Sequence, residues 1–408
     1  MPKKQTGVTK RKNGTWMAQA ELGRDPATGK RNRITRYGKT AAEAKAKLDE
    51  AKAAIRSGTY IEDESLTLGK WLEHWLKNYV DNNVKHSTYV EYKRFVEKRY
   101  IPHLGRVRLT DLKTDRLQSF YNDLHHFGNL REGGPLSAKT VRNIYLALHA
   151  ALRQAVVNRL MVYNPCDGVV LPRVEETEMR VLNVMEQYQV LEALKASGER
   201  YALGVLMAMK TGMRIGEICG LRWCDIDLGR GQIHICQTLQ RRMKKESAEG
   251  QPATEIIIGP PKSKKSKRVI PIPKQLIPCL IQQKRAQQEE AKAAGELYED
   301  KGYVLMNELG CYIEPRTLAD TFGRIQAAAE IPHANFHALR HTFATRAVEN
   351  GVDVKTLSEI LGHENVTTTM NRYVHSLDEQ KRKAMELMDG VMDTEAAVET
   401  DLMSVHLA

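Results

Sequence analysis

Four short stretches in the second half of the chain concentrate side chains that bind anions, transfer protons or act as nucleophiles. They are Thr211-Gly212-Met213-Arg214-Ile215-Gly216-Glu217, Pro261-Lys262-Ser263-Lys264, His337-Ala338-Leu339-Arg340-His341, and Leu361-Gly362-His363 followed by Asn371-Arg372-Tyr373. A guanidinium group binds phosphate oxygens through paired hydrogen bonds and stays charged at physiological pH. A tyrosine hydroxyl becomes a nucleophile where a cationic site and a nearby acceptor help to remove its proton. Together, these residue types could attack and stabilise a phosphate.

Each stretch also has an ordinary structural interpretation. Arg214 and Glu217 could form a simple i, i+3 ion pair on a helix, worth about a few tenths of a kcal/mol. The lysines after Pro261 could lie in a solvated hairpin turn. Tyr373 by itself is typical of a half-buried aromatic residue whose hydroxyl bonds to a neighbour. It is the combination of the stretches that favours a catalytic site.

His337 and His341 raise a second hypothesis, a zinc hydrolase, because they have the i, i+4 spacing of a helical metal pair. Position 338 is alanine, so the glutamate that serves as general base in H-E-x-x-H is missing. No further histidine or carboxylate follows at the usual distance. We therefore expect no metal at this site.

In their order along the chain, the stretches resemble the catalytic signature of the tyrosine recombinases, the phage-integrase family of site-specific DNA recombinases. The signature consists of an arginine in T-G-x-R-x-x-E, a lysine in a β-hairpin, H-x-L-R-H, L-G-H, and a tyrosine ten residues after that last histidine. The resemblance covers residues 180–390 and, more loosely, the two regions before them. A layout in three parts is more similar to integrases of temperate phages and conjugative transposons than to the two-domain Xer or Cre enzymes.

The resemblance implies a role for each matched residue. Arg214 and Arg340 would clamp the non-bridging oxygens of the scissile phosphate, where extra negative charge develops. Tyr373 would be the nucleophile, and His337 would accept or orient its proton. His363 would donate a hydrogen bond to the phosphate.

Two lysines are candidates for the general acid that protonates the departing 5′-hydroxyl. A lysine whose pKa is lowered by surrounding positive charge suits this task. The family form K-[ST]-K selects Lys262, while Lys264 lies two residues further on the same turn. Both residues stay candidates.

Other polar residues near the motifs would act indirectly. Glu217 would orient Arg214 without touching DNA, and His341 matches a position that is usually structural. Arg372, beside the tyrosine, is as well suited to holding a phosphate as to forming a surface ion pair. The DNA-binding candidates of this region are Lys264, Lys265 and Arg372.

The resemblance also implies the reaction and its partners. A 3′-phosphotyrosyl link with a free 5′-hydroxyl stores the energy of the broken bond, so that ligation would need no ATP, metal or cofactor. Four protomers would assemble on two double-stranded DNA sites, and an excisionase or a DNA-bending protein is a further expected partner. The expected function is integration and excision of a mobile element. The alternatives are a type IB topoisomerase-like enzyme that relaxes DNA, and a non-catalytic DNA-binding regulator on the same fold.

Charge and hydropathy agree with a DNA substrate. The 408 residues include 62 Lys and Arg against 50 Asp and Glu, a net charge of +12, which favours a polyanionic partner. No run of about 18 apolar residues occurs. The basic start is not followed by an apolar segment that could serve as a signal peptide, so we expect a cytoplasmic protein without membrane contact. Six cysteines without a CxxC pair are expected to be reduced and mostly buried.

The basic surplus is concentrated at the beginning of the chain. Residues 1–60 contain 15 Lys and Arg against 5 Asp and Glu, a net of +10. Strand-like alternation over 15–22 and 31–38, followed by a helical segment over 40–57, predicts a small sheet with one helix. We expect an arm-site DNA-binding domain over residues 1–62; the alternative is a solvated, partly disordered basic arm. Its DNA-binding candidates are Lys10, Arg11, Lys12, Arg31, Arg33 and Arg36.

Residues 66–165 predict a domain of four helices that would bind the core site. Apolar residues repeat at i, i+3, i+4 and i+7 from Leu68 to Tyr79, which is one face of an amphipathic helix and places Trp71 and Trp75 in a core. Further helices are predicted over 86–100, 114–126 and 137–159. Asn164-Pro165 ends the last helix, and residues 166–180 are expected to form a linker.

Residues 181–392 are expected to form the catalytic domain. Asn183 and Glu186 stand in the positions of a capping box and predict a helix to about residue 197, with another over 201–210. Most of the region beyond 272 is expected to be helical. The predicted strands cover 232–239, 255–258 and 267–272.

The end of the chain is acidic, with a net charge of −5 over residues 376–408. Residues 393–408 are expected to form a flexible tail. The stripe Met385, Met388, Val391 and Met392 could pack in cis or onto a neighbouring protomer. The expected fold is therefore multidomain α+β: a small basic sheet-plus-helix domain, a four-helix domain, and a mainly α catalytic domain with a small antiparallel three-stranded sheet.

Overall fold

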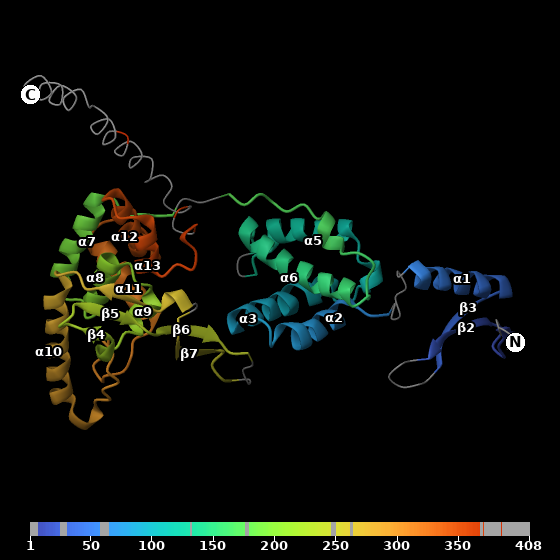
Figure 1. The fold of residues 1–408 in the computed structure, drawn as a ribbon, viewed down its shortest axis with the longest axis horizontal. Coiled ribbons are helices and arrows are strands. Elements are labelled where there is room, and N and C mark those ends of the chain that lie inside the picture. The colour runs from blue at the N-terminus through green and yellow to red at the C-terminus, as the bar shows by residue number, and fades with distance from the viewer. Residues whose placement is uncertain are drawn as a thin grey trace, which may run out of the picture. The chain divides into compact units, whose positions relative to one another are not determined.

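The computed structural model divides the chain into two compact units, Met1–Glu176 and Thr177–Ala408. The first unit holds two separate hydrophobic cores, and the second holds one large core and a small satellite. Figure 1 shows the elements in chain order. The structure describes residues 7–24, 31–57, 65–130, 133–175, 179–245, 250–261, 264–367, 370 and 385. The predicted tail and most of the methionine stripe lie outside these residues.

The beginning of the chain forms a three-stranded antiparallel sheet covered by one helix. The strands are β1 (Gly7–Lys10), β2 (Trp16–Arg24) and β3 (Arg31–Gly38), and the helix is α1 (Ala41–Ser57). Small apolar residues of α1 pack on one face of the sheet, which confirms the predicted sheet and helix. Strand β1 was not predicted, because its four residues are largely exposed and show no alternation of apolar side chains.

The second core of the first unit belongs to a helical domain. Two of its helices continue into π-helical turns, over Leu76–Val80 and Val96–Tyr100. Its helices are α2 (Leu68–Trp75), α3 (His86–Phe95), α4 (Ile101–Leu104), α5 (Thr114–Phe127) and α6 (Ala138–Val157). They match the four predicted helical segments, with α4 as a short extension of the second.

Both tryptophans of α2 lie in this core, as their spacing predicted. Trp71 is 2% exposed, and its indole N–H donates to the carbonyl of Ala151 at 3.0 Å. Trp75 stacks on Tyr92, with ring centroids 5.6 Å apart. Cys166, at the start of the predicted linker, is fully buried in the same core.

The second unit is mainly helical and contains two small antiparallel sheets. Its helices are α7 (Val184–Ala196), α8 (Ala202–Thr211), α9 (Ile215–Cys219), α10 (Leu276–Ala294), α11 (Pro315–Ala328), α12 (His337–Glu349) and α13 (Val354–Leu361). Its strands are β4 (Ile226–Asp227), β5 (Gln232–Ile235), β6 (Thr238–Met243), β7 (Thr254–Gly259) and β8 (Arg268–Pro271). Helix α7 begins with the predicted capping box of Asn183 and Glu186.

A small three-stranded sheet is present, but its membership differs from the prediction. The predicted strand 232–239 is two strands that belong to different sheets: β5 pairs with β4 and β8, whereas β6 pairs with β7. The chain leaves the first sheet at Gln237, whose side-chain amide donates to the carbonyl of Gly220 at 2.7 Å. The buried Ile233, Ile235 and Leu239 stand at odd positions on both sides of the break, so the pattern alone joined the two strands.

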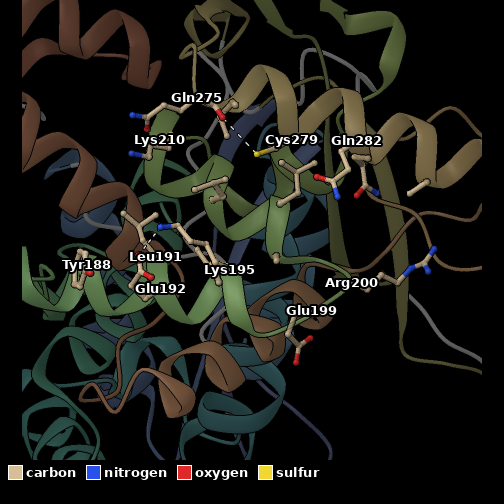
Figure 2. A pocket seen from close by; sticks show the side chains of 18 residues that line it. Tyr188, Leu191, Glu192, Lys195, Glu199, Arg200, Lys210, Gln275, Cys279 and Gln282 are labelled. Carbon is tan, nitrogen blue, oxygen red and sulfur yellow. Dashed lines mark hydrogen bonds and ion pairs between the residues drawn. The ribbon is translucent and has the colours of Figure 1, made fainter.

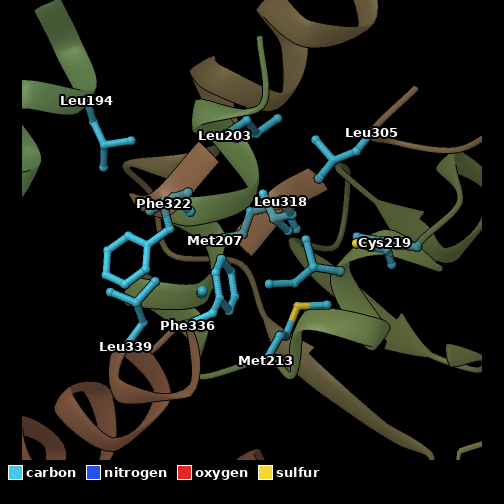
Figure 3. Close-up of a cluster of buried hydrophobic side chains, with 14 of the residues drawn as sticks. Leu194, Leu203, Met207, Met213, Cys219, Leu305, Leu318, Phe322, Phe336 and Leu339 are labelled. Carbon is cyan, nitrogen blue, oxygen red and sulfur yellow. The ribbon is translucent and has the colours of Figure 1, made fainter. Parts of the chain in front are cut away.

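The large core of the second unit gathers around α8 (Figure 3). Met207 of α8 lies among Phe322, Phe336 and Leu339, which come from α11 and from the start of α12. This packing fixes the end of α8 and the beginning of α12. Arg214 follows α8 by three residues, and Arg340 lies in the first turn of α12. No helix among the described residues is long and apolar enough to cross a membrane.

Candidate active site

Arg214 stands at the start of α9 and is held by Glu217. Gly212 adopts a left-handed conformation with φ of +64° and ends α8, so that the chain turns and α9 begins three residues later. The backbone N–H of Arg214 donates to Glu217 Oε2 at 3.0 Å, and its Nη1 donates to Glu217 Oε1 at 2.8 Å. The Arg214 side chain keeps 36% of its surface exposed, whereas Glu217 is 2% exposed. Glu217 thus orients an accessible guanidinium group.

A second arginine, Arg268 of β8, binds the same carboxylate. Its Nη1 and Nη2 donate to Glu217 Oε1 and Oε2 at 3.0 and 2.8 Å. Its Nε donates to the carbonyl of Ile360, and Nη1 also donates to that of Ser266 at 3.1 Å. The Arg268 side chain is 6% exposed. Arg268 is therefore enclosed between α9, α13 and the segment before β8.

The pKa of Glu217 is lowered although the residue is buried. Burial is the largest single influence and raises the pKa, but the hydrogen bonds and charge of Arg268, together with the charge and backbone N–H of Arg214, outweigh it. Glu217 is therefore ionised at neutral pH, between two guanidinium groups.

The C-terminal end of α13 accepts hydrogen bonds from three arginines. The carbonyls of Ile360, Leu361 and Gly362 are consecutive, and they accept from Arg268, Arg340 and Arg214 respectively. The last carbonyls of a helix lack partners within the helix and carry partial negative charge, which favours cations there. Gly362 ends the helix with φ of +64°. The end of α13 thus fixes the two motif arginines and Arg268.

Arg340 lies on α12 and is buried. Its Nη2 donates to the Leu361 carbonyl at 2.7 Å, and its Nη1 donates to the Gly212 carbonyl at 2.8 Å. Gly212 lies two residues before Arg214. The structure therefore brings Arg214 and Arg340 together, although 126 positions separate them in the sequence.

The three histidines of the motifs occupy different environments. His337 is the first residue of α12 and is exposed, and its ring meets that of the buried His341 edge to face, with centroids 4.6 Å apart. His363 is buried and directly follows the glycine that ends α13. Among the described residues, no three histidine, cysteine, aspartate or glutamate side chains gather as metal ligands would.

Part of the predicted site lies outside the described residues, namely Lys262, Arg372 and Tyr373, together with the side chain of Lys264. Lys265 is described, and its Nζ donates to the carbonyl of Glu364 at 2.9 Å. This contact brings Lys265 beside the residue that follows His363.

The DNA-binding candidates of the first sheet and its turn are exposed, apart from the partly buried Arg36. Arg33 and Tyr37 alternate with the buried Ile34 and so lie on the face opposite α1. Arg11 lies over the Tyr37 ring, with its guanidinium carbon 5.3 Å from the centroid, and Lys10 lies over Trp16 at 5.9 Å. The remaining candidates, Lys12 and Arg31, are exposed as well.

A cavity of about 850 Å³ lies apart from the motif residues. It is lined by residues from α7 to the end of α8 and by α10, among them Tyr188, Lys195, Arg200 and Cys279 (Figure 2). None of the candidate catalytic residues lines it. The candidate site is instead built around the end of α13.

Arg268 is the site residue that the sequence did not single out. It follows a run of lysines, and its charge alone could not be told from theirs. A signal was present in the alternation of β8, where Arg268 and Ile270 share one face of the strand and Ile270 is buried.

Three family models match the chain in the order of its parts. The arm DNA-binding domain matches residues 6–55, the N-terminal SAM-like domain of phage integrases matches residues 67–125, and the phage integrase family matches residues 180–380. These matches support the three-part fold: an arm-binding domain, a helical domain and a catalytic domain.

Similar proteins include recombinases and integrases. A tyrosine recombinase XerC-like protein of Caldanaerobacter subterraneus subsp. tengcongensis is 34% identical over 397 residues, which cover 95% of this chain and 98% of the relative. The Tn1549 transposon integrase in complex with transposon right end DNA has a TM-score of 0.64 at 22% identity, covering 79% of this chain and 100% of that one. A lambda integrase tetramer bound to a Holliday junction has a TM-score of 0.51 at 21% identity, covering 90% and 97%.

The two solved structures show a shared fold at these identities, and the XerC-like relative matches almost the whole chain. The chain therefore belongs to the phage integrase family, whose members are site-specific recombinases that cleave and rejoin DNA.

Proposed function

We propose that this recombinase integrates and excises a mobile element through a 3′-phosphotyrosyl intermediate. The observation that carries the proposal is the pair of hydrogen bonds from Arg214 and Arg340 to consecutive carbonyls at the end of α13. Because the two carbonyls are adjacent, one helix end holds both guanidinium groups, and both would act on the same phosphate. The proposal is also supported by the similarity to a transposon integrase.

The roles follow from the chemistry of strand cleavage. Arg214 and Arg340 stabilise the charge that develops on the non-bridging oxygens, and His363, next to the same helix end, donates to the phosphate. Tyr373 attacks the phosphorus and His337 takes up its proton. A lysine, Lys262 or Lys264, protonates the leaving 5′-hydroxyl.

In this step the bond from the tyrosine oxygen to phosphorus forms as the bond to the 5′-oxygen breaks. The 3′-phosphate stays bound to Tyr373, so the phosphotyrosyl link keeps the energy of the broken bond. The 5′-hydroxyl of the partner strand then attacks the phosphotyrosyl link and frees the tyrosine. Four protomers on two DNA sites would carry out two rounds of this exchange. The lambda integrase tetramer on a Holliday junction supports such an assembly by similarity of fold.

The division of labour along the chain is part of the proposal. Residues 1–62 bind arm sites, residues 66–165 bind the core site, and residues 181–392 perform the chemistry, with a linker at 166–180. The match of an arm DNA-binding domain to residues 6–55 supports the first assignment. Accessory proteins, such as an excisionase or a DNA-bending protein, would set the direction of the reaction.

The test uses a nicked duplex that spans the boundary between the mobile element and its flanking DNA. Cleavage beside the nick releases a short strand, so the covalent protein–DNA adduct accumulates and is seen as a shifted band under denaturing conditions. The wild type should form the adduct, and Tyr373→Phe should bind the duplex without forming it. The control is Tyr188→Phe, an exposed tyrosine of α7, which should react like the wild type.

An adduct that persists in Tyr373→Phe would show that another residue is the nucleophile. A topoisomerase-like function is distinguished by offering two duplexes and a supercoiled plasmid. Joined duplexes are expected; relaxation of the plasmid without any joined product would contradict integration.

A further inference from the structure

We propose that Arg268 is a positioning residue for strand cleavage, because it ties together the three segments that carry Arg214, the candidate lysines and His363. This inference rests on the proposed function and deepens it. Four of the five N–H groups of Arg268 already donate to protein oxygens, so its effect would pass through the residues that it holds.

The contacts of Arg268 reach all three segments. Its forked guanidinium group binds both oxygens of Glu217, three residues after Arg214. Its Nη1 also donates to the Ser266 carbonyl, two residues after Lys264, and its Nε donates to the Ile360 carbonyl, three residues before His363. Three planar, directed hydrogen-bonding positions are a property of arginine that lysine lacks.

Charge gives Arg268 a second effect on Arg214. Glu217 is buried and ionised, so with Arg214 as its only partner it would neutralise the charge that is meant for phosphate. With Arg268 also bound, the cluster of two guanidinium groups and one carboxylate keeps a net charge of +1. Arg214 can thus be held by Glu217 and still present positive charge at the surface.

The same unit offers a matched control in Arg200. Its Nη1 and Nη2 each donate to Glu290 at 2.7 Å, and its Nε donates to the Met306 carbonyl at 3.1 Å. Like Arg268, Arg200 binds both oxygens of one carboxylate and donates its Nε to a main-chain carbonyl; Arg268 has one further main-chain acceptor, Ser266. It lines the cavity of Figure 2 and contacts none of the candidate catalytic residues.

The experiment compares Arg268→Met and Arg268→Lys with Arg200→Met and Arg200→Lys in the full chain. The probe is the nicked boundary duplex, and the adduct is followed at several protein concentrations. This separates the rate constant at saturation from the concentration that gives half-maximal rate. Thermal melting of each variant measures how far the fold is affected.

For Arg268→Met, the rate constant at saturation should fall by about 10- to 100-fold, at most the effect of losing one direct oxyanion donor, because Arg268 acts through Arg214 and its neighbours. The half-saturating concentration should change by less than about threefold, since binding of the duplex does not use Arg268. Arg268→Lys keeps the charge and should recover part of the rate. Both Arg200 variants should react at the wild-type rate, even where they melt earlier.

The proposal is overturned if a folded Arg268→Met protein forms the adduct at the wild-type rate, or if Arg200→Met slows the reaction equally. If Arg268→Met does not fold, Arg268→Lys decides in the same way, with Arg200→Lys as its control. Absence of the adduct in the wild type would overturn the proposed function, and this inference with it. An active wild type with unaffected Arg268 variants would overturn this inference alone.

Discussion

Arg340 of α12 and Arg214, the N-cap of α9, donate to adjacent carbonyls, Leu361 at 2.7 Å and Gly362 at 3.2 Å. The two guanidinium groups are thus positioned by one helix end, which belongs to neither of their own helices. Since Arg340 also binds the Gly212 carbonyl, it fixes the turn that leads to Arg214. The two arginines should therefore respond together to changes at the end of α13.

Replacing Arg340 by lysine should slow strand cleavage while the duplex still binds. One ammonium group cannot bond to both Gly212 and Leu361 while presenting a planar edge to phosphate. We expect the rate of adduct formation to fall by about 10²–10³-fold, as for a lost oxyanion donor. The control is Arg324→Lys, whose exposed side chain binds Glu199 on the surface. Equal rates in the two variants would contradict the role of Arg340.

Gly362→Ala should damage the site through Arg268. At φ of +64° an alanine is strained by about 1 kcal/mol, and its Cβ would lie 3.0 Å from both Cδ and Nη1 of Arg268. We expect a lower melting temperature and slower formation of the covalent adduct. The comparison is Gly351→Ala, also at positive φ but with open space around the new Cβ. Gly351→Ala should lower the melting temperature and leave the rate unchanged.

Acid should weaken the fold partly through Glu217. Because its pKa is lower in the folded than in the unfolded state, its stabilising effect is complete above the unfolded value of about 4.5 and is lost as the pH falls through the folded pKa. Glu217→Gln should therefore have a smaller free energy of unfolding than the wild type at pH 7. This difference should shrink at acidic pH, as measured by urea titrations along a pH series. A difference that grows as the pH falls would contradict the assignment.

The cysteines should react with maleimide at very different rates. Burial raises the pKa of both Cys166 and Cys219 to about 12, so their thiolate fraction at pH 8 is negligible. Cys224 and Cys236 are exposed and Cys279 and Cys311 are partly exposed, so the expectation of mostly buried thiols is wrong. Mass spectrometry should find native labelling at Cys224 first, with Cys166 and Cys219 labelled only after denaturation.

The exposed arginines of the first sheet should set the salt dependence of DNA binding. Each phosphate contact that is lost should lower the slope of log affinity against log salt by about 0.9. Replacing Arg31 and Arg33 by alanine in the full chain should therefore flatten the slope for a duplex with arm sites. A duplex that contains only the core site is the control, since its slope should not change.

The sequence predicted the elements that have strong local signals. The apolar spacing around Trp71 and Trp75 identified α2, and the capping box at Asn183 identified the start of α7. The break at Gln237 was missed, because it depends on a side-chain contact with Gly220, a residue that is distant in the sequence.

The motifs of the site, Glu217 among them, were found for a similar reason, whereas Arg268 and the helix end that joins the arginines were not. Arg214, Glu217 and Arg340 stand in short patterns with fixed spacing. Arg268 binds Glu217 from 51 positions away, and the helix end that joins the arginines acts through main-chain oxygens. Neither kind of contact leaves a local pattern of residue types.

The anchor at the end of α13 consists of peptide oxygens, which every residue type possesses. Side chains on the outer surface of this helix, such as the exposed Lys355 and Glu359, can be exchanged without moving the guanidinium groups. Substitutions on this exposed surface of α13 should therefore leave the rate of strand cleavage unchanged.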